Sequence, residues 1–367
     1  MSVRSAYIHI PFCKSKCNYC SFVSFKNQDK KSGYLYSLLK EIDYYYNGEN
    51  LDTLYIGGGT PSLLSAEELG KLYNKFNLSD NTEKTVELNP NDINDDYAKK
   101  LYDIGFNRVS LGAQSFDDDI LKIIGRRHCV QEIYNAVNCL KKAGFENINI
   151  DLIYGLPNQT IENFRHDIEE VIKLDIPHVS MYGLKIEEGC YFYKNRPNNL
   201  PDDDFQADMY IMACDMMKKN GFEHYEVSNF AKPNYQSKHN KNYWKCGGYY
   251  GFGVSAHGYV DGIRYSNYST LEDYMDSPTS HEIGKFLTKQ EMLEESIFLG
   301  FRLSEGIDIS KINSNFDIDF ETKYKKILDK YLMTGHIEKT LNGYRLSDNK
   351  DHSGFLLSNV ILSEFLD

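Results

Sequence analysis

Three cysteines lie close together near the start of the chain, with Cys13, Cys17 and Cys20 spaced four and three residues apart. Among biological metals, thiolates select zinc or iron–sulfur clusters, and a closed structural zinc site normally has four ligands. Three thiolates on a cubane cluster instead leave one iron open to a ligand that chelates it through an amine and a carboxylate. The spacing therefore favours a 4Fe-4S cluster. A zinc site completed by His9 or a distant cysteine is the alternative.

The elements that position these thiols follow an alternating pattern. Short β-rich runs are bounded by turn residues, and helical apolar spacing separates them. The predicted strands are Ala6–Ile10, Thr53–Ile56, Thr85–Leu88, Arg108–Leu111, Ile148–Ile153 and His178–Tyr182. The helical patterns cover 35–42, 69–76 (behind a Ser65/Glu68 capping box), 97–104, 133–143 and 161–174. This succession predicts a parallel sheet buried on both faces, either doubly wound or closing like a barrel.

The alternation ends near Pro201, and helical spacing returns from about residue 288. We expect a first unit over 1–200, an extension over 201–284 and a helical unit over 285–367. In the last unit, helices are expected at Lys289–Phe301 and Phe320–Tyr331, and a small winged hairpin at Gly335–Arg345. A winged helix often indicates DNA binding, but the acidic charge favours packing over the barrel mouth or a partner protein.

Composition narrows the class of protein. The 367 residues are 41% hydrophobic and 26% charged, as in an ordinary globular protein, and the net charge is −12. That charge disfavours nucleic acid as the main partner. No apolar run approaches a membrane span and the N-terminus lacks a secretory signal, so we expect a cytoplasmic protein with reduced thiols.

A glycine run strengthens the prediction of a cluster. Gly57, Gly58, Gly59 and Thr60 follow the second strand, where backbone groups can approach a ligand closely. Together with the three cysteines after the first strand, this run resembles the radical S-adenosylmethionine superfamily. The resemblance implies a partial (β/α)6 barrel and a 4Fe-4S cluster whose open iron is chelated by S-adenosylmethionine.

Polar residues at the ends of later strands extend this resemblance. Glu87, Gln114, Arg126 and Asp151 lie at or after strand ends, where barrel enzymes bind ligands. Their motifs (86–90, 112–116, 125–128 and 151–157) are similar to those of the anaerobic coproporphyrinogen oxidase subgroup. The resemblance implies that these four side chains contact S-adenosylmethionine, and that Tyr7 and Tyr19 line its site.

Two features depart from the oxidases of this subgroup. Phe22 stands where they carry a fourth cysteine, and only six residues precede Tyr7. Both features are similar to relatives described as haem chaperones. The predicted function is therefore to bind haem and transfer it to an acceptor protein, which the resemblance alone suggests is a membrane respiratory enzyme. Oxygen-independent coproporphyrinogen III oxidation is the first alternative, and a radical methyltransferase is the second.

The candidate haem residues lie in the extension. They are His239, Asn240, Tyr243, Trp244 and, in a glycine-rich turn, His257. An imidazole can bind iron, flat aromatic rings can pack on a porphyrin and an amide can bond a propionate. The alternative is that the aromatic residues anchor a loop to the barrel and that His239 is a capping histidine.

Overall fold

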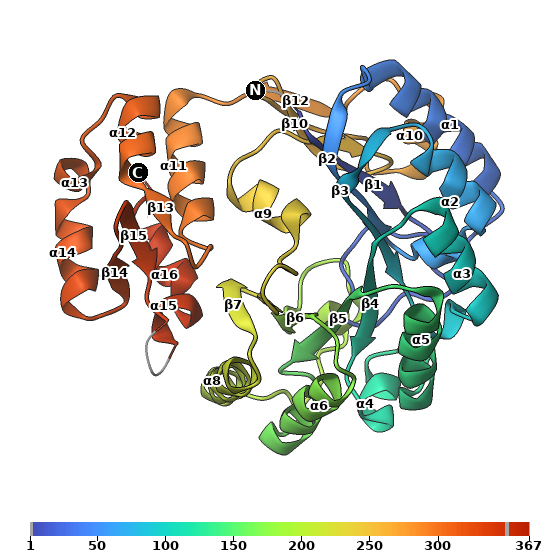
Figure 1. Ribbon diagram of the computed structural model, residues 1–367, viewed down its shortest axis with the longest axis horizontal. Coiled ribbons are helices and arrows are strands. Elements are labelled where there is room, and N and C mark those ends of the chain that lie inside the picture. The colour runs from blue at the N-terminus through green and yellow to red at the C-terminus, as the bar shows by residue number, and fades with distance from the viewer. Residues whose placement is uncertain (1–2, 349–351, 367) are drawn as a thin grey trace.

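The computed structural model describes residues 3–348 and 352–366, and its main feature is one curved sheet of nine strands (Figure 1). Six parallel strands form its centre, in the order β6-β5-β4-β3-β2-β1. They are β1 (Ser5–Ile10), β2 (Asn50–Gly58), β3 (Asn77–Leu88), β4 (Arg108–Gln114), β5 (Asn147–Tyr154) and β6 (His178–Gly183). The six predicted strands are confirmed, and the partial barrel of the predicted fold class is confirmed with them.

Helices cover the outer face of this sheet. They are α1 (Lys31–Tyr45), α2 (Ala66–Tyr73), α3 (Asp95–Ile104), α4 (Asp118–Ile123), α5 (Val130–Ala143) and α6 (Ile161–Lys173), with the short helices η1 (Pro61–Leu63) and η2 (Pro90–Asp92) at strand ends. Ser65 and Glu68 form the predicted capping box of α2. Gly105 and Gly144 end α3 and α5 in the left-handed conformation that glycine favours.

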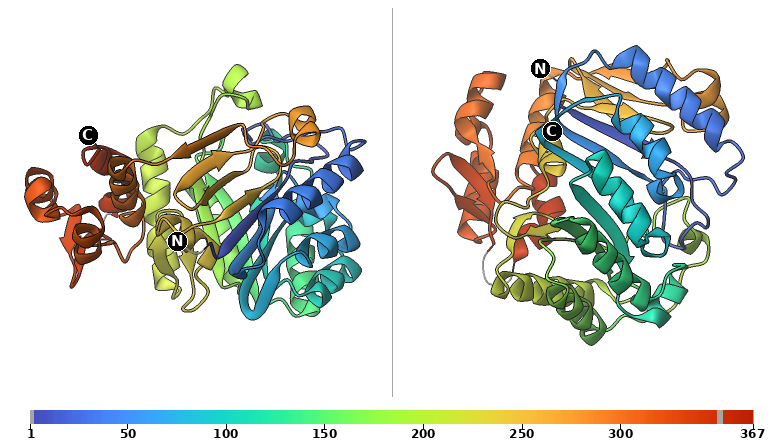
Figure 2. Two further views of the ribbon diagram at one scale, coloured as in Figure 1. Left: turned by 90° about the horizontal axis from the view of Figure 1, so that it is seen from above. Right: turned by 45° about the vertical axis from the view of Figure 1, so that its right-hand side comes forward.

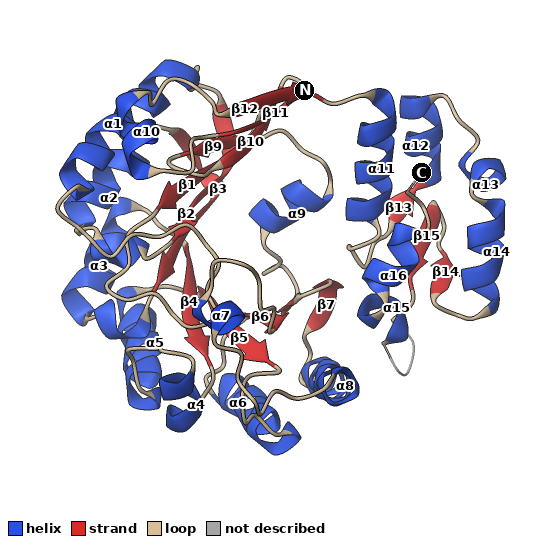
Figure 3. Ribbon diagram, turned by 180° about the vertical axis from the view of Figure 1, so that it is seen from behind, coloured by secondary structure: helices blue, strands red, loops and turns tan. Residues whose placement is uncertain are grey.

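The barrel stays open between the two edges of the sheet. One edge is β9 (Tyr250–Phe252), parallel to β1, and the other is the antiparallel pair β8 (Asn229–Ala231) and β7 (Glu223–Glu226). In Figure 1, α9 (Lys238–Trp244) lies in the gap. Helices α7 (Tyr191–Lys194) and α8 (Asp203–Lys219) lie between β6 and β7 in the sequence. Figure 3, the view from behind, shows α7 near β4 and β6.

A second, antiparallel sheet follows the barrel strands. It contains β10 (His257–Val260), β11 (Ile263–Ser266) and β12 (Ile283–Phe286), with α10 (Leu271–Asp276) between the last two. Strand β12 spans residues 284 and 285, where the sequence places the boundary of the C-terminal unit.

The C-terminal unit lies beside the barrel (Figure 2). Its helices are α11 (Lys289–Gly300), α12 (Ile309–Phe316), α13 (Phe320–Lys323), α14 (Lys325–Met333), α15 (Ser353–Leu356) and α16 (Ser358–Ser363), and its strands are β13 (Ile307–Asp308), β14 (Ile337–Lys339) and β15 (Gly343–Leu346). The predicted hairpin is present as β14 and β15. The single helix expected over Phe320–Tyr331 is wrong, because the helix is interrupted at Tyr324.

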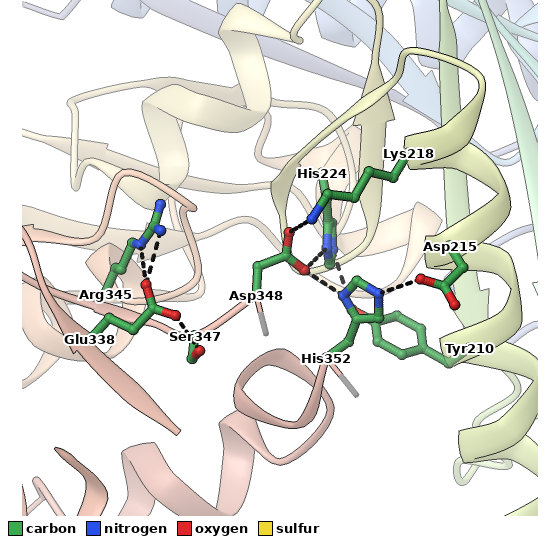
Figure 4. A network of polar contacts seen from close by, with 9 residues as sticks. All are labelled: Tyr210, Asp215, Lys218, His224, Glu338, Arg345, Ser347, Asp348 and His352. Atoms are coloured by element: carbon green, nitrogen blue, oxygen red, sulfur yellow. Dashed lines mark hydrogen bonds and ion pairs between the residues drawn. The ribbon is translucent and has the colours of Figure 1, made fainter. Parts of the chain in front are cut away.

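Charged side chains join this unit to the barrel (Figure 4). Asp348 accepts a hydrogen bond from His352 and lies 3.6 Å from Lys218 and 3.8 Å from His224. Burial opposes ionisation of Asp348, but hydrogen bonds to both histidines lower its pKa overall. The same carboxylate raises the pKa of His352. These contacts fix the unit against α8 and β7.

No helix in the described part of the chain is long and apolar enough to cross a membrane.

Candidate functional site

A cavity of about 570 Å³ opens at the carboxyl ends of the parallel strands. It is the place where barrels of this type bind ligands. Twelve of the predicted site residues line it: Cys13, Cys17, Tyr19, Cys20, Gly58, Gly59, Thr60, Glu87, Gln114, Arg126, Asp151 and Asn240. No described residue of the C-terminal unit does, so this unit packs beside the barrel and not over its mouth.

Backbone hydrogen bonds fix the loop that carries the three thiols. Cys13 N donates to Phe25 O at 3.1 Å, and Phe25 N donates to Pro11 O at 2.6 Å. Asn18 N donates to Ile124 O at 2.9 Å, and the Asn18 side chain donates to Ile123 O at 2.8 Å. The loop is therefore tied both to the end of β1 and to the turn after α4.

The thiols themselves are only partly buried and make few contacts. Cys13 Sγ lies 3.3 Å from Thr60 Oγ1, and Arg126 donates to Cys17 Sγ at 3.5 Å. Burial raises the pKa of Cys13, and it raises the pKa of Cys20 to about 11. Both thiols are therefore protonated in the free protein, and a bound metal must displace these protons.

The separation of the thiols argues against a single zinc ion. Two ligands of one zinc lie at most about 4.6 Å apart, twice the usual zinc–sulfur bond. Among the described residues, Cys13, Cys17 and Cys20 do not form a group with all three sulfurs within 4.8 Å of one another. Both ring nitrogens of His9 also have partners, Tyr7 at 3.0 Å and Val23 O at 3.1 Å. The wider spacing suits a 4Fe-4S cluster, in which each of the three thiolates binds a different iron.

Close backbone packing explains the glycine run. Gly58 has φ +112°, and a Cβ there would meet the His9 ring at 2.5 Å. A Cβ on Gly59 would lie 2.9 Å from Ile10 O and 3.1 Å from Cys13 Sγ. The run thus brings β2 against the cysteine loop, and larger side chains would push the loop away.

Glu87 is the most strongly perturbed acid of the cavity. Its carboxylate accepts hydrogen bonds from Tyr55 at 2.7 Å and from Gly58 N at 3.0 Å. Burial, with the nearby charge of Asp151, raises its pKa to about 7 despite these bonds. A buried acid of this kind gains a favourable partner when an ammonium group enters the cavity.

Arg126 lies against the thiol of Cys17 and also contacts the end of β4. It donates to Asn89 Oδ1 at 2.7 Å, to Gly112 O and to Cys17 Sγ, while its Nε has no partner. Gly112 has no side chain to block this approach, since a Cβ there would lie 3.3 Å from Arg126. The free Nε–H leaves this guanidinium able to donate a charge-assisted hydrogen bond to a carboxylate.

Asp151 and Gln114 lie on neighbouring strands. Asp151 accepts hydrogen bonds from Asn149 at 2.8 Å and Ser110 at 3.1 Å, and burial raises its pKa. Gln114 ends β4 with φ +72°, at a register shift between Gly112 and Gln114. This local irregularity accompanies the turn of the chain into the cavity mouth.

Several residues of the parallel strands line the cavity but were not predicted from the sequence. They are Tyr55, Arg108, Ser110, Asn149, Ser180 and Tyr182. The signal that could have found them is the period of two along a strand, because Arg108 and Ser110 share a face with Gly112, and Asn149 shares one with Asp151. Arg108 is only 2% exposed and its Nε lacks a partner.

Most of the candidate haem residues on α9, unlike the thiols, lie outside the cavity lining and pack against other side chains. His239 is 1% exposed; its Nδ1 lies 2.7 Å from Thr53 Oγ1 and its Nε2 lies 2.8 Å from Tyr243 Oη. Its ring stacks on Tyr55 at 5.0 Å, and burial lowers its pKa to about 3. Trp244 packs under the guanidinium of Arg302 at 5.5 Å. Of the α9 candidates, only Asn240 lines the cavity.

The remaining predicted residues lie outside the cavity lining. The Tyr7 hydroxyl contacts the His9 ring. Gly57 packs against Glu87, because a Cβ on Gly57 would lie 2.8 Å from the Glu87 Cδ. His257 is exposed on β10. Neither His239 nor His257 lines the cavity.

Comparisons with known proteins agree with this geometry. The model of the radical SAM superfamily matches residues 7–171, and the model of the HemN C-terminal domain matches residues 287–349. The solved coproporphyrinogen III oxidase HemN of Escherichia coli shares the fold with a TM-score of 0.86, at 23% identity, over 99% of this chain and 90% of that one. The fold and the cavity thus define a radical S-adenosylmethionine protein.

Two full-length relatives narrow the family. A protein of Lactococcus lactis named Heme chaperone HemW is 41% identical, over 99% of this chain and 97% of its own length. One of Escherichia coli K12 with the same name is 34% identical, over 99% and 98%. The chain belongs to the HemW family.

The residues present fit the cofactors of this superfamily. Cys13, Cys17 and Cys20 would hold the 4Fe-4S cluster. Arg126, Glu87 and Asp151 offer partners for the carboxylate, ammonium and hydroxyl groups of S-adenosylmethionine. When bound, the cluster supplies one electron. The chain's own groups would orient the ligand within the cavity.

Proposed function

We propose that this protein is a haem chaperone, which binds haem and transfers it to an acceptor protein. The observation that carries the proposal is similarity over the full length to two proteins named Heme chaperone HemW, in both the barrel and the C-terminal unit. The likeness to the coproporphyrinogen oxidase supports the fold alone, because the two chains are 23% identical. The proposed location is the cytoplasm, and the proposed acceptor is a membrane respiratory enzyme.

A residue at the cavity supports haem binding over oxidation of coproporphyrinogen. Phe22 lines the cavity close to the cysteine loop and is 67% exposed. An apolar ring at this place offers a flat surface to a porphyrin, whereas a thiol would offer a reactive group. The site assignments follow from this proposal: the cavity residues hold the cluster and S-adenosylmethionine, and α9 serves as part of the barrel wall.

The test is performed anaerobically on the full chain with its cluster reconstituted. Haem is titrated and the Soret band recorded; in parallel, coproporphyrinogen is supplied with reductant and S-adenosylmethionine. We expect a saturable Soret shift, no protoporphyrinogen, and transfer of the bound haem to an apo-acceptor. Sustained formation of protoporphyrinogen would instead assign the oxidase activity.

A further inference from the structure

The rim of the cavity differs in character from its floor. The floor is polar and carries Glu87 and Asp151, which the proposed function assigns to S-adenosylmethionine. The rim carries two aromatic rings, Phe22 at 67% and Tyr182 at 43% exposure. Exposed aromatic side chains at the edge of a concave site indicate a ligand with an apolar face.

Two chain segments build this rim and are tied together. Phe22 follows the cysteine loop, and Tyr182 is the last residue but one of β6, which ends at Gly183 just before residues 184–187. Ser21 Oγ donates to Glu187 Oε2 at 2.9 Å, next to Phe22. The backbone of α7 also donates to the loop, from Phe192 N to Asn18 O at 2.9 Å. The two aromatic residues are therefore held on one edge of the same cavity.

The charge of the lining is opposite to that of the chain. The chain carries a net charge of −12. The lining, in contrast, has three acidic residues and six basic ones, which are Lys14, Lys16, Arg108, Arg126, Arg127 and Lys185. Such a concentration of positive charge in an acidic protein attracts an anionic ligand to the cavity mouth.

Two of the three lysines in this lining are available to a ligand. Lys14 pairs with Asp92 at 2.9 Å, and Arg127 lies 3.9 Å from the same carboxylate. Within the described part of the chain, no carboxylate lies within 4.0 Å of the ammonium groups of Lys16 and Lys185. Lys185 is exposed and lies three residues after Tyr182, on the segment that carries the apolar rim.

We propose that the rim formed by Lys16, Phe22, Tyr182 and Lys185 is the surface on which haem docks. This inference rests on the proposed function. Haem combines a flat apolar macrocycle with two carboxylates; the aromatic rings contact the macrocycle and the two lysines bind the propionates. Haem then lies over the mouth of the cavity and does not bind the buried His239 of α9.

The experiment compares exposed rim substitutions with matched controls elsewhere on the surface. Phe22→Ala is paired with Tyr36→Ala on α1, where the ring is 73% exposed. Lys185→Glu is paired with Lys326→Glu on α14, which changes the net charge equally. We expect haem affinity to fall about tenfold for Phe22→Ala and about fivefold for Lys185→Glu. Both controls should match the wild type. Iron content is measured in each variant, since Phe22 lies two residues from Cys20.

A ligand without free carboxylates isolates the role of the lysines. Haem dimethyl ester keeps the macrocycle but loses both charges, so Lys185→Glu should no longer weaken its binding, whereas Phe22→Ala still should. Rim variants that bind haem as tightly as the wild type would overturn the docking surface and leave the proposed function standing. A wild-type protein that takes up no haem would overturn both.

Discussion

The cysteine loop and helix α9 are both rich in groups that bind iron, but their donor atoms are used differently. The thiols of the loop are partly exposed and line a cavity, and their neighbours include Thr60 and Arg126. His239 of α9 is buried and has a partner at each ring nitrogen. A binding site needs donor atoms that the protein leaves available, which favours the thiols of the loop over the His239 imidazole as ligands.

The largest expected effect is the loss of the cluster in Cys17→Ala. Two thiolates cannot replace three on a cubane cluster, so iron bound after anaerobic reconstitution should fall by about tenfold or more. The measurement is iron and sulfide content together with the visible absorption band. Cys129→Ala, at an exposed cysteine outside the cavity, is the matched control and should keep its iron. A Cys17→Ala protein with full iron content would remove the loop from the cluster site.

Replacing His239 by Ala should act on stability and not on haem. The change leaves Thr53 and Tyr243 without a buried partner and removes the ring stacked on Tyr55. The expected loss is about 2–3 kcal/mol of unfolding free energy, measured by denaturant titration. Haem affinity and the Soret maximum should stay as in the wild type.

The exposed His257 provides the control for this change. His257→Ala should alter neither the stability nor the haem spectrum, because the side chain lies on the surface of β10. The opposite pattern, in which His239→Ala keeps its stability but loses the haem spectrum, would make α9 the haem site and reverse the comparison.

Arg126→Lys tests whether the cavity floor recognises a carboxylate by its geometry. Lysine keeps the positive charge but cannot contact Asn89, Gly112 and Cys17 together and still donate to a ligand. The affinity for S-adenosylmethionine, measured by anaerobic calorimetry, should fall about tenfold. Arg127→Lys, at the neighbouring residue of the lining, should change the affinity for S-adenosylmethionine less than about twofold. Equal losses in both variants would mean that the geometry of the Arg126 guanidinium is not what recognises the ligand.

The sequence contained much of the site because its signals are local. A parallel strand ends where its side chains can meet a ligand, so Glu87 and Asp151 could be assigned once the strands were predicted. The sequence left two interpretations of the α9 residues open, haem contacts or anchors of a loop, for a physical reason. The partner of His239 is Thr53, 186 residues earlier, and only the folded barrel brings the two side chains to 2.7 Å. Whether a donor atom is free to bind a ligand depends on such long-range pairs. The residue type alone does not reveal this.

The smallest effect concerns the protonation of Glu87, whose pKa is raised to about 7 mainly by burial. The ionised carboxylate is the form that attracts an ammonium group, and it is lost as pH falls through this pKa. The affinity of the wild type for S-adenosylmethionine should therefore decrease severalfold from pH 8 to pH 6. Glu87→Gln should bind more weakly at pH 8 but show a flat profile over this range, since its amide does not titrate. Asp92→Asn, at an acid that pairs with Lys14, is the control and should keep the slope of the wild type. A slope that persists in Glu87→Gln would assign the titration to another group, Asp151 being the next buried acid of the cavity.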